Sequence, residues 1–270
     1  MEHPITLADA STAQEIQVFN IARRAFLLED VFPHDELGAP TTDEDREELL
    51  SPTYDEHLDR LCNRVVNRAH RTFFLQGGER IGFCTWCTYH SEDGKCFIID
   101  FWVLPKHRGR GVGHACFAAL RLRAAAEGAI YFECNTHSQR SLRFWQSLGF
   151  VFNGYDRWGS LLLLNPPPDE PIVCEPLPAE DGWQALNLWN GRRGESGLPF
   201  LTEEEQDALV KAIEAGTLHL VAAKRRTRVV GLCPVGQGAL PEAVEPTPWV
   251  EPAFRGKGIE EALLAAAGEC

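Results

Sequence analysis

The six residues from Arg108 to Gly113 combine two arginines with three glycines, immediately before an apolar, alanine-rich run. Glycine lacks a Cβ atom and adopts positive φ readily, so the backbone amides of such a segment can converge on a ligand. The helix that we expect over residues 112–127 adds its unpaired first-turn N–H groups and the positive end of its dipole. With the charges of Arg108 and Arg110, this pattern predicts a phosphate or pyrophosphate site at a helix N-terminus. The alternative is a tight strand-to-helix turn with solvated arginines.

The glycine spacing narrows the class of ligand. A dinucleotide-binding fingerprint would place its last glycine where the chain has His114, and a nucleoside-triphosphate loop would continue with Gly-Lys-Ser/Thr, which does not follow here. We therefore expect the diphosphate to belong to a molecule other than NAD or ATP.

The composition is that of a globular chain, with 44% hydrophobic and 24% charged residues among 270. This length suffices for one large domain or two ordinary ones. No apolar run has the length of a membrane span, and "MEHPITLADA" lacks the features of a signal peptide, so we expect a cytoplasmic location. The net charge of −13 argues against a nucleic-acid surface, which needs a clustered basic face.

The nine cysteines are scattered through apolar segments, and their odd number favours buried free thiols over disulfides. Cys84 and Cys87 have the spacing of zinc ligands, but they lie in a strand-like run and no second pair accompanies them. We therefore expect no metal site.

The order of elements indicates an α/β fold. Helical patterns run from Ser11 to about residue 70, followed by a hairpin around a Gly-Gly turn and the apolar strand "CFIIDFWVL". The glycine-rich loop and its helix come next, then the strand "AIYFECN", the helix "SQRSLRFWQSLG" and two closing strands. This series predicts a mixed, mostly antiparallel sheet flanked by helices in a domain over residues 1–165.

The remainder of the chain restarts this pattern. The proline-rich segment "PPPDEP" at 166–171 predicts a linker, because three consecutive prolines offer no amides to a β-ladder. Over residues 172–270, aligning Trp249 with Trp102 matches "WVEPAFRGKGIE" to "WVLPKHRGRGVG" at six of twelve positions, which favours an internal duplication. The copy has no counterpart of the later strand, helix and closing strands, so we expect an incomplete second domain.

Two motifs carry a resemblance to a known family. Arg108-Gly109-Arg110-Gly111-Val112-Gly113 resembles the acetyl-CoA loop, Q/R-x-x-G-x-G/A, of the GCN5-related N-acetyltransferase (GNAT) family. Downstream, "FECNTHSQRSLRFWQSLGF" resembles that family's next block, which commonly reads L-E-V-x-x-x-N-x-x-A-x-x-x-Y-x-x-x-G-F. The positions that correspond to the block are Phe132, Glu133, Cys134, Ser138, Ser141, Trp145, Gly149 and Phe150. The resemblance spans roughly residues 5–165 and implies a tandem arrangement with an incomplete second GNAT-like copy.

The resemblance implies that a primary amine attacks bound acetyl-CoA directly. The loop amides and arginines would take the pyrophosphate, and the strand around Trp102 would hydrogen-bond the pantetheine arm, with amides that could also stabilise the oxyanion. The residues expected at the cofactor are Trp102, Val103, Leu104, Arg108, Gly109, Arg110, Gly111, Val112, Gly113, His114, Ser138 and Trp145.

The attacking amine must lose a proton, and a carboxylate is the usual base. Glu133 lies where several members of the family place that base, and Asp100, on the strand that leads to the loop, is the other candidate. Each has a simpler alternative, since Glu133 could pair with a neighbouring arginine and Asp100 could cap polar backbone.

The family often uses the tyrosine of the second motif to protonate the departing thiolate. Trp145 occupies that position here, and its N–H does not titrate near neutrality. Because a thiol has a pKa near about 8.5, water can protonate the leaving group, and we expect Trp145 to form a wall against the pantetheine. Ser138, in place of asparagine, keeps a hydrogen-bonding group that its own helix could satisfy instead.

The acceptor is less defined. Residues 29–59, a segment that often shapes the acceptor site in this family, hold twelve Asp and Glu residues. An acidic rim would attract a small-molecule or peptide amine, whereas the alternative is a solvated helix face. Open strand edges in an incomplete copy predict packing against the first domain or a second subunit, as in a homodimer. Two other classes of protein fit the sequence: a non-catalytic acyl-CoA-binding or regulatory protein, and a different diphosphate binder.

Overall fold

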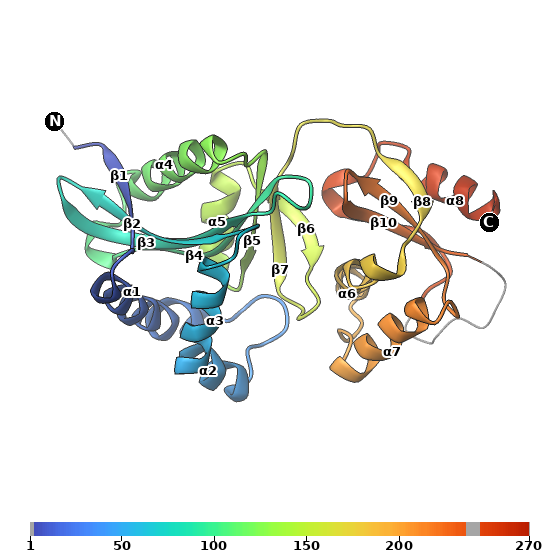
Figure 1. The fold of residues 1–270 in the computed structure, drawn as a ribbon, viewed down its shortest axis with the longest axis horizontal. Helices are drawn as coiled ribbons and strands as arrows, with labels where there is room; N and C mark the ends of the chain where they lie inside the picture. Colours follow the sequence, from blue (N-terminus) through green and yellow to red (C-terminus); the bar gives the residue numbers. More distant parts are fainter. Residues whose placement is uncertain (1–2, 236–243, 270) are drawn as a thin grey trace. The chain divides into compact units, whose positions relative to one another are not determined.

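The computed structural model describes residues 3–235 and 244–269, which divide into two compact units (Figure 1). The first unit comprises Met1–Glu36 and Pro40–Gly149, and the second comprises Leu37–Ala39 and Phe150–Cys270. The strands β6 (Val151–Tyr155) and β7 (Leu161–Asn165) pair antiparallel and fall in the second unit. The domain boundary expected at Asn165 therefore stays a prediction.

Five strands of the first unit pair in chain order. They are β1 (Ile5–Asp9), β2 (Ala69–Gln76), β3 (Glu79–Thr88), β4 (Lys95–Val103) and β5 (Tyr131–Thr136). The neighbours β1–β2, β2–β3 and β3–β4 are antiparallel, and β4–β5 is parallel. Gly77 and Gly78 adopt positive φ in the tight turn between β2 and β3, so the predicted hairpin is confirmed.

Helices cover both faces of these strands, as Figure 1 shows for α1 to α3 on one side and α4 and α5 on the other. Their bounds are α1 (Ala13–Phe26), α2 (Asp43–Leu50), α3 (Pro52–Cys62), α4 (Val112–Ala126) and α5 (Gln139–Ser147). A capping box at Thr12 starts α1, which continues into a π-helical turn, η1 (Leu27–Val31), and a 3₁₀ turn, η2 (Phe32–His34). The predicted mixed sheet flanked by helices is confirmed.

Aromatic side chains fix the two faces of the sheet. On the α1 face, Phe19 packs edge to face on Phe83, with 4.8 Å between the ring centroids, and Phe83 packs on Trp102 at 5.7 Å. On the opposite face, Phe117 of α4 packs on Phe132 of β5 at 5.3 Å. Because successive residues of a strand point to opposite faces, these contacts assign the neighbouring side chains as well.

The second unit has its own antiparallel sheet and core. Its elements are β8 (Val173–Pro176), η4 (Ala179–Asp181), α6 (Gln184–Glu195), α7 (Glu203–Glu214), β9 (Leu220–Arg225), β10 (Arg228–Pro234), β11 (Trp249–Val250), η5 (Pro252–Phe254) and α8 (Ile259–Glu269). The sheet order is β11-β10-β9-β8. Trp189 of α6 belongs to the buried cluster beneath this sheet. The strand, helices, three antiparallel strands, short turn and helix occur in the same order from β1 to α4 of the first unit.

The structure also describes the cysteines, the potential metal ligands and the lengths of the helices. The eight cysteines that the structure describes are free, and the ninth, Cys270, lies outside the described residues. No group of metal-binding side chains occurs within residues 3–235 and 244–269. No helix of the same residues is long and apolar enough to cross a membrane.

Asp9, at the end of β1, links the sheet to α4. Its carboxylate accepts a hydrogen bond from the hydroxyl of Thr72 at 2.8 Å and lies 3.1 Å from Nη2 of Arg123 on α4. The ring of His70 lies 3.7 Å from the same carboxylate. The neighbouring His70 contributes most to lowering the pKa of Asp9 to about 2, and Thr72 and Arg123 lower it further against the opposing effect of burial.

We expect Asp9→Asn to lower the free energy of unfolding near neutral pH, because the variant loses the charge that His70 and Arg123 face. The loss should be only on the order of 1 kcal/mol, because solvent screens this half-exposed carboxylate. Since the folded-state pKa lies below the ordinary value of 3.8, the stabilisation is complete above 3.8 and is lost as the pH falls toward about 2. Urea unfolding across this range should show a smaller acid-induced loss in the variant than in the wild type. Equal losses would contradict a stabilising role for the carboxylate.

Candidate active site

The loop between β4 and α4 has three consecutive residues in the left-handed region. The φ angles of Gly109, Arg110 and Gly111 are +86°, +50° and +80°. A Cβ atom built on Gly109 or Gly111 would have no heavy atom within 4 Å. These two glycines are therefore required by backbone conformation rather than by crowding, and they face open space where a ligand can approach.

The start of α4 carries no cap from a side chain. Gly111 is the N-cap residue, the amide of Val112 donates to the carbonyl of Gly109 at 3.1 Å, and the first turn contains no acidic residue. The amide of Ala115 makes the first helical bond, to Gly111 at 3.0 Å, which leaves the earlier first-turn amides without an intrahelical acceptor. An uncapped helix start with this dipole suits an anion.

The third glycine of the motif has a different role. Gly113 does not adopt positive φ, and a Cβ atom there would lie 2.9 Å from the ring of Phe144 on α5. His114 packs edge to face on the same ring and forms a hydrogen bond with Ser147 at 3.0 Å. These two residues therefore bring α4 and α5 close together, and Gly113 serves this contact rather than a positive φ.

The two arginines of the loop differ in their surroundings. Arg108 donates from Nε to the carbonyl of Val103 at 2.7 Å and from Nη1 to Asp30 at 3.1 Å, and its Nη2 also pairs with Asp30. The indole of Trp102 donates to the same carboxylate. Burial alone would raise the pKa of Asp30, but the hydrogen bonds from Arg108 and Trp102 outweigh it and lower the pKa. Arg110 is exposed and pairs with none of the residues that the structure describes.

The backbone of β4 loses its β5 partner before the loop begins. The parallel ladder runs from Lys95↔Tyr131 to Ile98↔Cys134, while β4 continues to Val103. Opposite β3, Ile98 pairs with Trp86 and Asp100 with Thr85, which leaves residue 99 as a β-bulge. The segment from Asp100 to Leu104 therefore presents an edge without a β5 neighbour. The resemblance to the GNAT family implies that the pantetheine arm binds along this edge.

Both candidate bases lie on the α1 face of the sheet. Asp100 faces Arg23 of α1, with Oδ2 and Nε 3.2 Å apart. Phe132 packs on Phe117 of α4, so the next residue, Glu133, points to the opposite face. The structure thus brings the two carboxylates to one side of the separating strands.

Each candidate base is buried beside a basic group. Asp100 and Arg23 are 5% and 2% exposed, and Arg23 also donates to the carbonyl of Leu49 at 3.0 Å. Glu133 is 4% exposed, and its Oε1 lies 3.5 Å from Nζ of Lys95. The Arg23–Asp100 pair is therefore shorter and more enclosed than the Lys95–Glu133 pair.

The two second-motif residues have packing roles. Ser138 is the N-cap of α5 and accepts a hydrogen bond from the amide of Ser141 at 3.1 Å, the alternative foreseen for it. Trp145 packs edge to face on Phe101 at 5.3 Å and on Phe144 at 5.0 Å between ring centroids. Contact of Ser138 or Trp145 with a cofactor stays a prediction.

Five of the twelve acidic side chains of residues 29–59 contact other parts of the first unit. The pairs are Asp30 with Arg108, Asp35 with His137, Asp55 with Arg24 and Asp59 with Arg71. Glu36 accepts a hydrogen bond from the amide of Gln139 at the start of α5. Sequence reasoning missed Asp30 and Arg23 as site residues, because no local pattern links them to positions 78 and 77 residues away.

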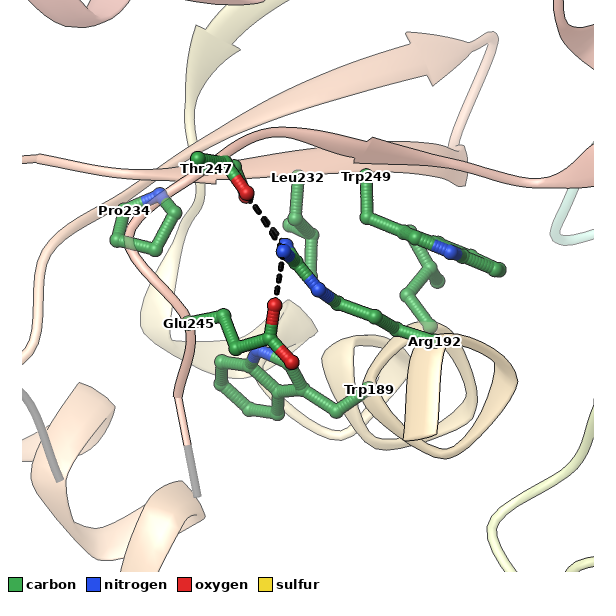
Figure 2. A pocket seen from close by; sticks show the side chains of 8 residues that line it. Trp189, Arg192, Leu232, Pro234, Glu245, Thr247 and Trp249 are labelled. Atoms are coloured by element: carbon green, nitrogen blue, oxygen red, sulfur yellow. Dashed lines mark hydrogen bonds and ion pairs between the residues drawn. The ribbon is translucent and has the colours of Figure 1, made fainter. Parts of the chain in front are cut away.

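The second unit has a small pocket beside α6. Figure 2 shows Arg192 of α6 reaching between Glu245 and Thr247, beside Leu232 and Trp249. Nη1 of Arg192 lies 2.6 Å from the carbonyl of Thr247, and the guanidinium pairs with Glu245. Arg192 is thus one of the eight residues that line this small pocket.

The sequence model described as Acetyltransferase (GNAT) family matches residues 35–150. This range contains the glycine-rich loop and both candidate bases. The chain therefore carries a GNAT acetyltransferase domain, and the family resemblance of this part is confirmed. Members of the family generally transfer acyl groups from acetyl-CoA.

Several solved structures resemble the chain. An acetyltransferase from Thermus thermophilus is 18% identical, with 61% of this chain and 98% of that chain covered and a TM-score of 0.44. The PaiA N-acetyltransferase from Thermoplasma acidophilum, in complex with coenzyme A, is 12% identical, with 59% and 97% covered and a TM-score of 0.44. The acetyltransferase from Streptococcus agalactiae 2603 is 12% identical, with 59% and 96% covered and a TM-score of 0.43. No curated protein matches the chain.

Because the Arg23–Asp100 pair is buried, we expect Asp100→Asn to change the stability of the fold as well as any catalytic role of Asp100. We expect a loss of about 3 kcal/mol in the free energy of unfolding, because Arg23 would keep a buried charge without its partner. Urea unfolding measures this loss. As a control, Glu79→Gln removes an exposed pairing with Lys106 and should lower the free energy of unfolding much less than Asp100→Asn does. Losses of the same size in both variants would contradict a dependence of Arg23 on Asp100.

Proposed function

We propose that the first unit transfers an acetyl group from acetyl-CoA to a primary amine by direct attack. The observation that carries this proposal is the left-handed, uncapped loop Gly109–Gly111 at the start of α4, beside the point where β4 and β5 separate. The loop supports binding of a diphosphate, and the separated strands support binding of an extended arm next to it.

The residues fit this substrate in two places. First-turn amides of α4 and the exposed Arg110 would meet the pyrophosphate, because these donors have no partner among the residues that the structure describes. The backbone of Trp102 to Leu104 would hydrogen-bond the pantetheine arm. Amide donors on this edge would also stabilise the negative charge that develops on the thioester oxygen.

We place the base at Glu133, with Asp100 as the second candidate. Both lie on the α1 face, but Asp100 is committed to the closer ion pair with Arg23, whereas Lys95 is farther from Glu133. A base that accepts the amine's proton must exchange its partner for the substrate. Glu133 is favoured because it occupies the position of the second motif where several members of the family place the base.

The departing thiolate would receive its proton from water. Trp145 stands where the family often has tyrosine, and it packs in the aromatic cluster with Phe101 and Phe144. No titrating group is available from that side chain. Because a thiol with a pKa near about 8.5 leaves readily, this substitution is compatible with catalysis.

A non-catalytic acyl-CoA-binding or regulatory protein is the alternative function. Two observations favour it: Trp145 replaces the usual acid, and both candidate bases are buried beside basic groups. Such a protein would bind acetyl-CoA but would release no CoA when amines are added.

We also propose that the second unit is an incomplete copy that binds no acetyl-CoA. Trp249 and Val250 pair with β10 as Trp102 and Val103 pair with β3. The copied helix, however, begins with acidic residues: α8 carries Glu260 and Glu261 in its first turn. A negative charge there would oppose the binding of a diphosphate, because like charges at close range repel each other.

The remaining features of the proposal concern the surroundings. A cytoplasmic location, a small-molecule or peptide amine as the acceptor and a possible homodimer stay predictions. Three acidic side chains of residues 29–59 support a structured wall at the acceptor side. Asp30 has its partner in the loop, and Asp35 and Glu36 have theirs at His137 and at the start of α5.

Gly109→Ala tests the proposed function against a matched control. We expect calorimetry to show one acetyl-CoA bound per wild-type chain and a Kd at least about tenfold higher in Gly109→Ala, because alanine resists the left-handed conformation that aims the amides. Gly78→Ala is the control, since Gly78 has the same φ of +86° and the same open surroundings in a distant hairpin. Its Kd should equal that of the wild type. Absence of binding by the wild type, or equal effects in both variants, would overturn the assignment of this loop.

Glu133→Gln tests the base. We expect turnover to fall by more than about tenfold with little change in acetyl-CoA affinity, because the variant keeps the shape but cannot accept the proton. The ascending limb of the rate against pH should disappear, as measured by thiol release with a panel of amines. Full activity with an unchanged pH profile would mean that Glu133 is not the base.

A further inference from the structure

Asp30 contacts the glycine-rich loop from outside it. It lies in η1, directly after α1, and accepts hydrogen bonds from both Arg108 and Trp102. Arg140 of α5 lies 3.6 Å away from the same carboxylate. Asp30 is 17% exposed and Arg108 is 22% exposed, so the contact is mostly enclosed. One carboxylate thus connects α1, the end of β4 and the loop.

Arg108 closes the turn between β4 and the loop. Its Nε donates to the carbonyl of Val103, five residues earlier, across the 3₁₀ turn η3 (Pro105–His107). Its two remaining nitrogens face Asp30. With all three nitrogens engaged by the protein, the guanidinium is held toward the protein rather than toward a ligand.

The second unit contains the same set of contacts, with different residues. Nε of Arg255 donates to the carbonyl of Val250 at 2.9 Å, and its Nη1 and Nη2 donate to Glu195 at 3.0 and 2.6 Å. The indole of Trp249 donates to Glu195 at 3.0 Å. The glutamate is the last residue of α6, whereas Asp30 lies in the π-helical turn after α1.

The backbone is also the same at the two arginines. The φ and ψ angles are −72° and 159° at Arg108, and −66° and 161° at Arg255. Glycines with positive φ follow both arginines, at 109 and 111 and at 256 and 258. The contacts therefore accompany the same backbone at the arginine and positive φ at both glycines, although φ is positive at Arg110 and not at its counterpart Lys257. The carboxylate comes from a different position and residue type.

The loop of the second unit shows that these contacts do not depend on a favourable anion site. The second loop leads into a helix with Glu260 and Glu261 in its first turn, an arrangement unfavourable to an anion. The Arg255–Glu195–Trp249 contact is nevertheless complete there. A contact that persists where no anion is favoured serves the loop itself.

We infer that Asp30 is a positioning residue for acetyl-CoA binding: it holds Arg108 so that the loop amides and Arg110, rather than Arg108, meet the diphosphate. This inference builds on the proposed function and changes the role expected of Arg108. Arg110 is the loop cation that has no protein partner among the described residues. The opposite hypothesis is that Asp30 competes with the diphosphate for Arg108. Removal of the Asp30 charge would weaken acetyl-CoA binding under the first hypothesis and strengthen it under the second.

Calorimetry of Asp30→Asn, Arg108→Gln and the double variant with acetyl-CoA distinguishes these hypotheses. We expect each single variant to raise the Kd by about tenfold and the double variant to be no weaker than either, because both changes break the same contact. Raising the salt concentration should weaken acetyl-CoA binding to Arg108→Gln as much as binding to the wild type. The effect of salt should be smaller for Arg110→Gln, because this variant lacks the charge that contacts the diphosphate. Tighter binding by Asp30→Asn, or loss of salt dependence in Arg108→Gln, would overturn the inference.

A measurement without ligand keeps this test separate from the proposed function. Hydrogen exchange of the intact, folded protein should become at least about tenfold faster at residues 104–115 in Asp30→Asn and Arg108→Gln. Glu195→Gln is the matched control, with faster exchange at residues 251–262 and an unchanged Kd for acetyl-CoA. If the wild type binds no acetyl-CoA, the proposed function fails. If exchange at residues 104–115 is unchanged in Asp30→Asn, the inference about Asp30 fails.

Discussion

The parallel pairing of β4 with β5 ends at Ile98, and the rest of the site depends on that end. The bulge that follows places Asp100 toward Arg23 on the α1 face and Phe101 toward Trp145 on the other face. With no β5 neighbour beyond this point, the backbone of β4 offers an unpaired edge that leads directly into the glycine-rich loop. A ladder that continued to Val103 would close the same edge with hydrogen bonds and leave no slot for an extended ligand.

Local features of the site could be predicted from the sequence, whereas contacts over long distances could not. The conformations of Gly109 and Gly111 follow from a glycine pattern before a helical run, and the hairpin and the mixed sheet follow from short-range patterns. Asp30 is one of twelve acidic residues in its segment, and only the fold brings it to Arg108. Gly113 shows a second limit, because a sequence does not distinguish a glycine needed for φ from one needed for a close ring contact.

The assignment of β6 and β7 to a compact unit was equally beyond the sequence. Both strands were expected from their apolar patterns, but their packing depends on small residues far along the chain. A Cβ atom on Gly154 of β6 would lie 3.4 Å from Gly191 of α6 and equally close to Trp249. Contacts of this kind, between backbones that approach because side chains are missing, leave no periodic signal in the sequence.

The loops that precede α4 and α8 show that the conformation of such a loop and its affinity for an anion depend on different residues. Each loop has an arginine bound to a strand carbonyl and to a carboxylate, a tryptophan bound to that carboxylate, and positive-φ glycines before a helix. These contacts are internal to the protein, so they specify the backbone whether or not a ligand is present. The capacity to hold an anion depends instead on what the loop leaves unpaired. The first loop leaves Arg110 and a helix start without acidic residues, and the second places Glu260 and Glu261 at that start. An arginine in such a motif is therefore a weaker guide to ligand contact than the charge of the first helical turn, because the arginine can be committed to shaping the loop.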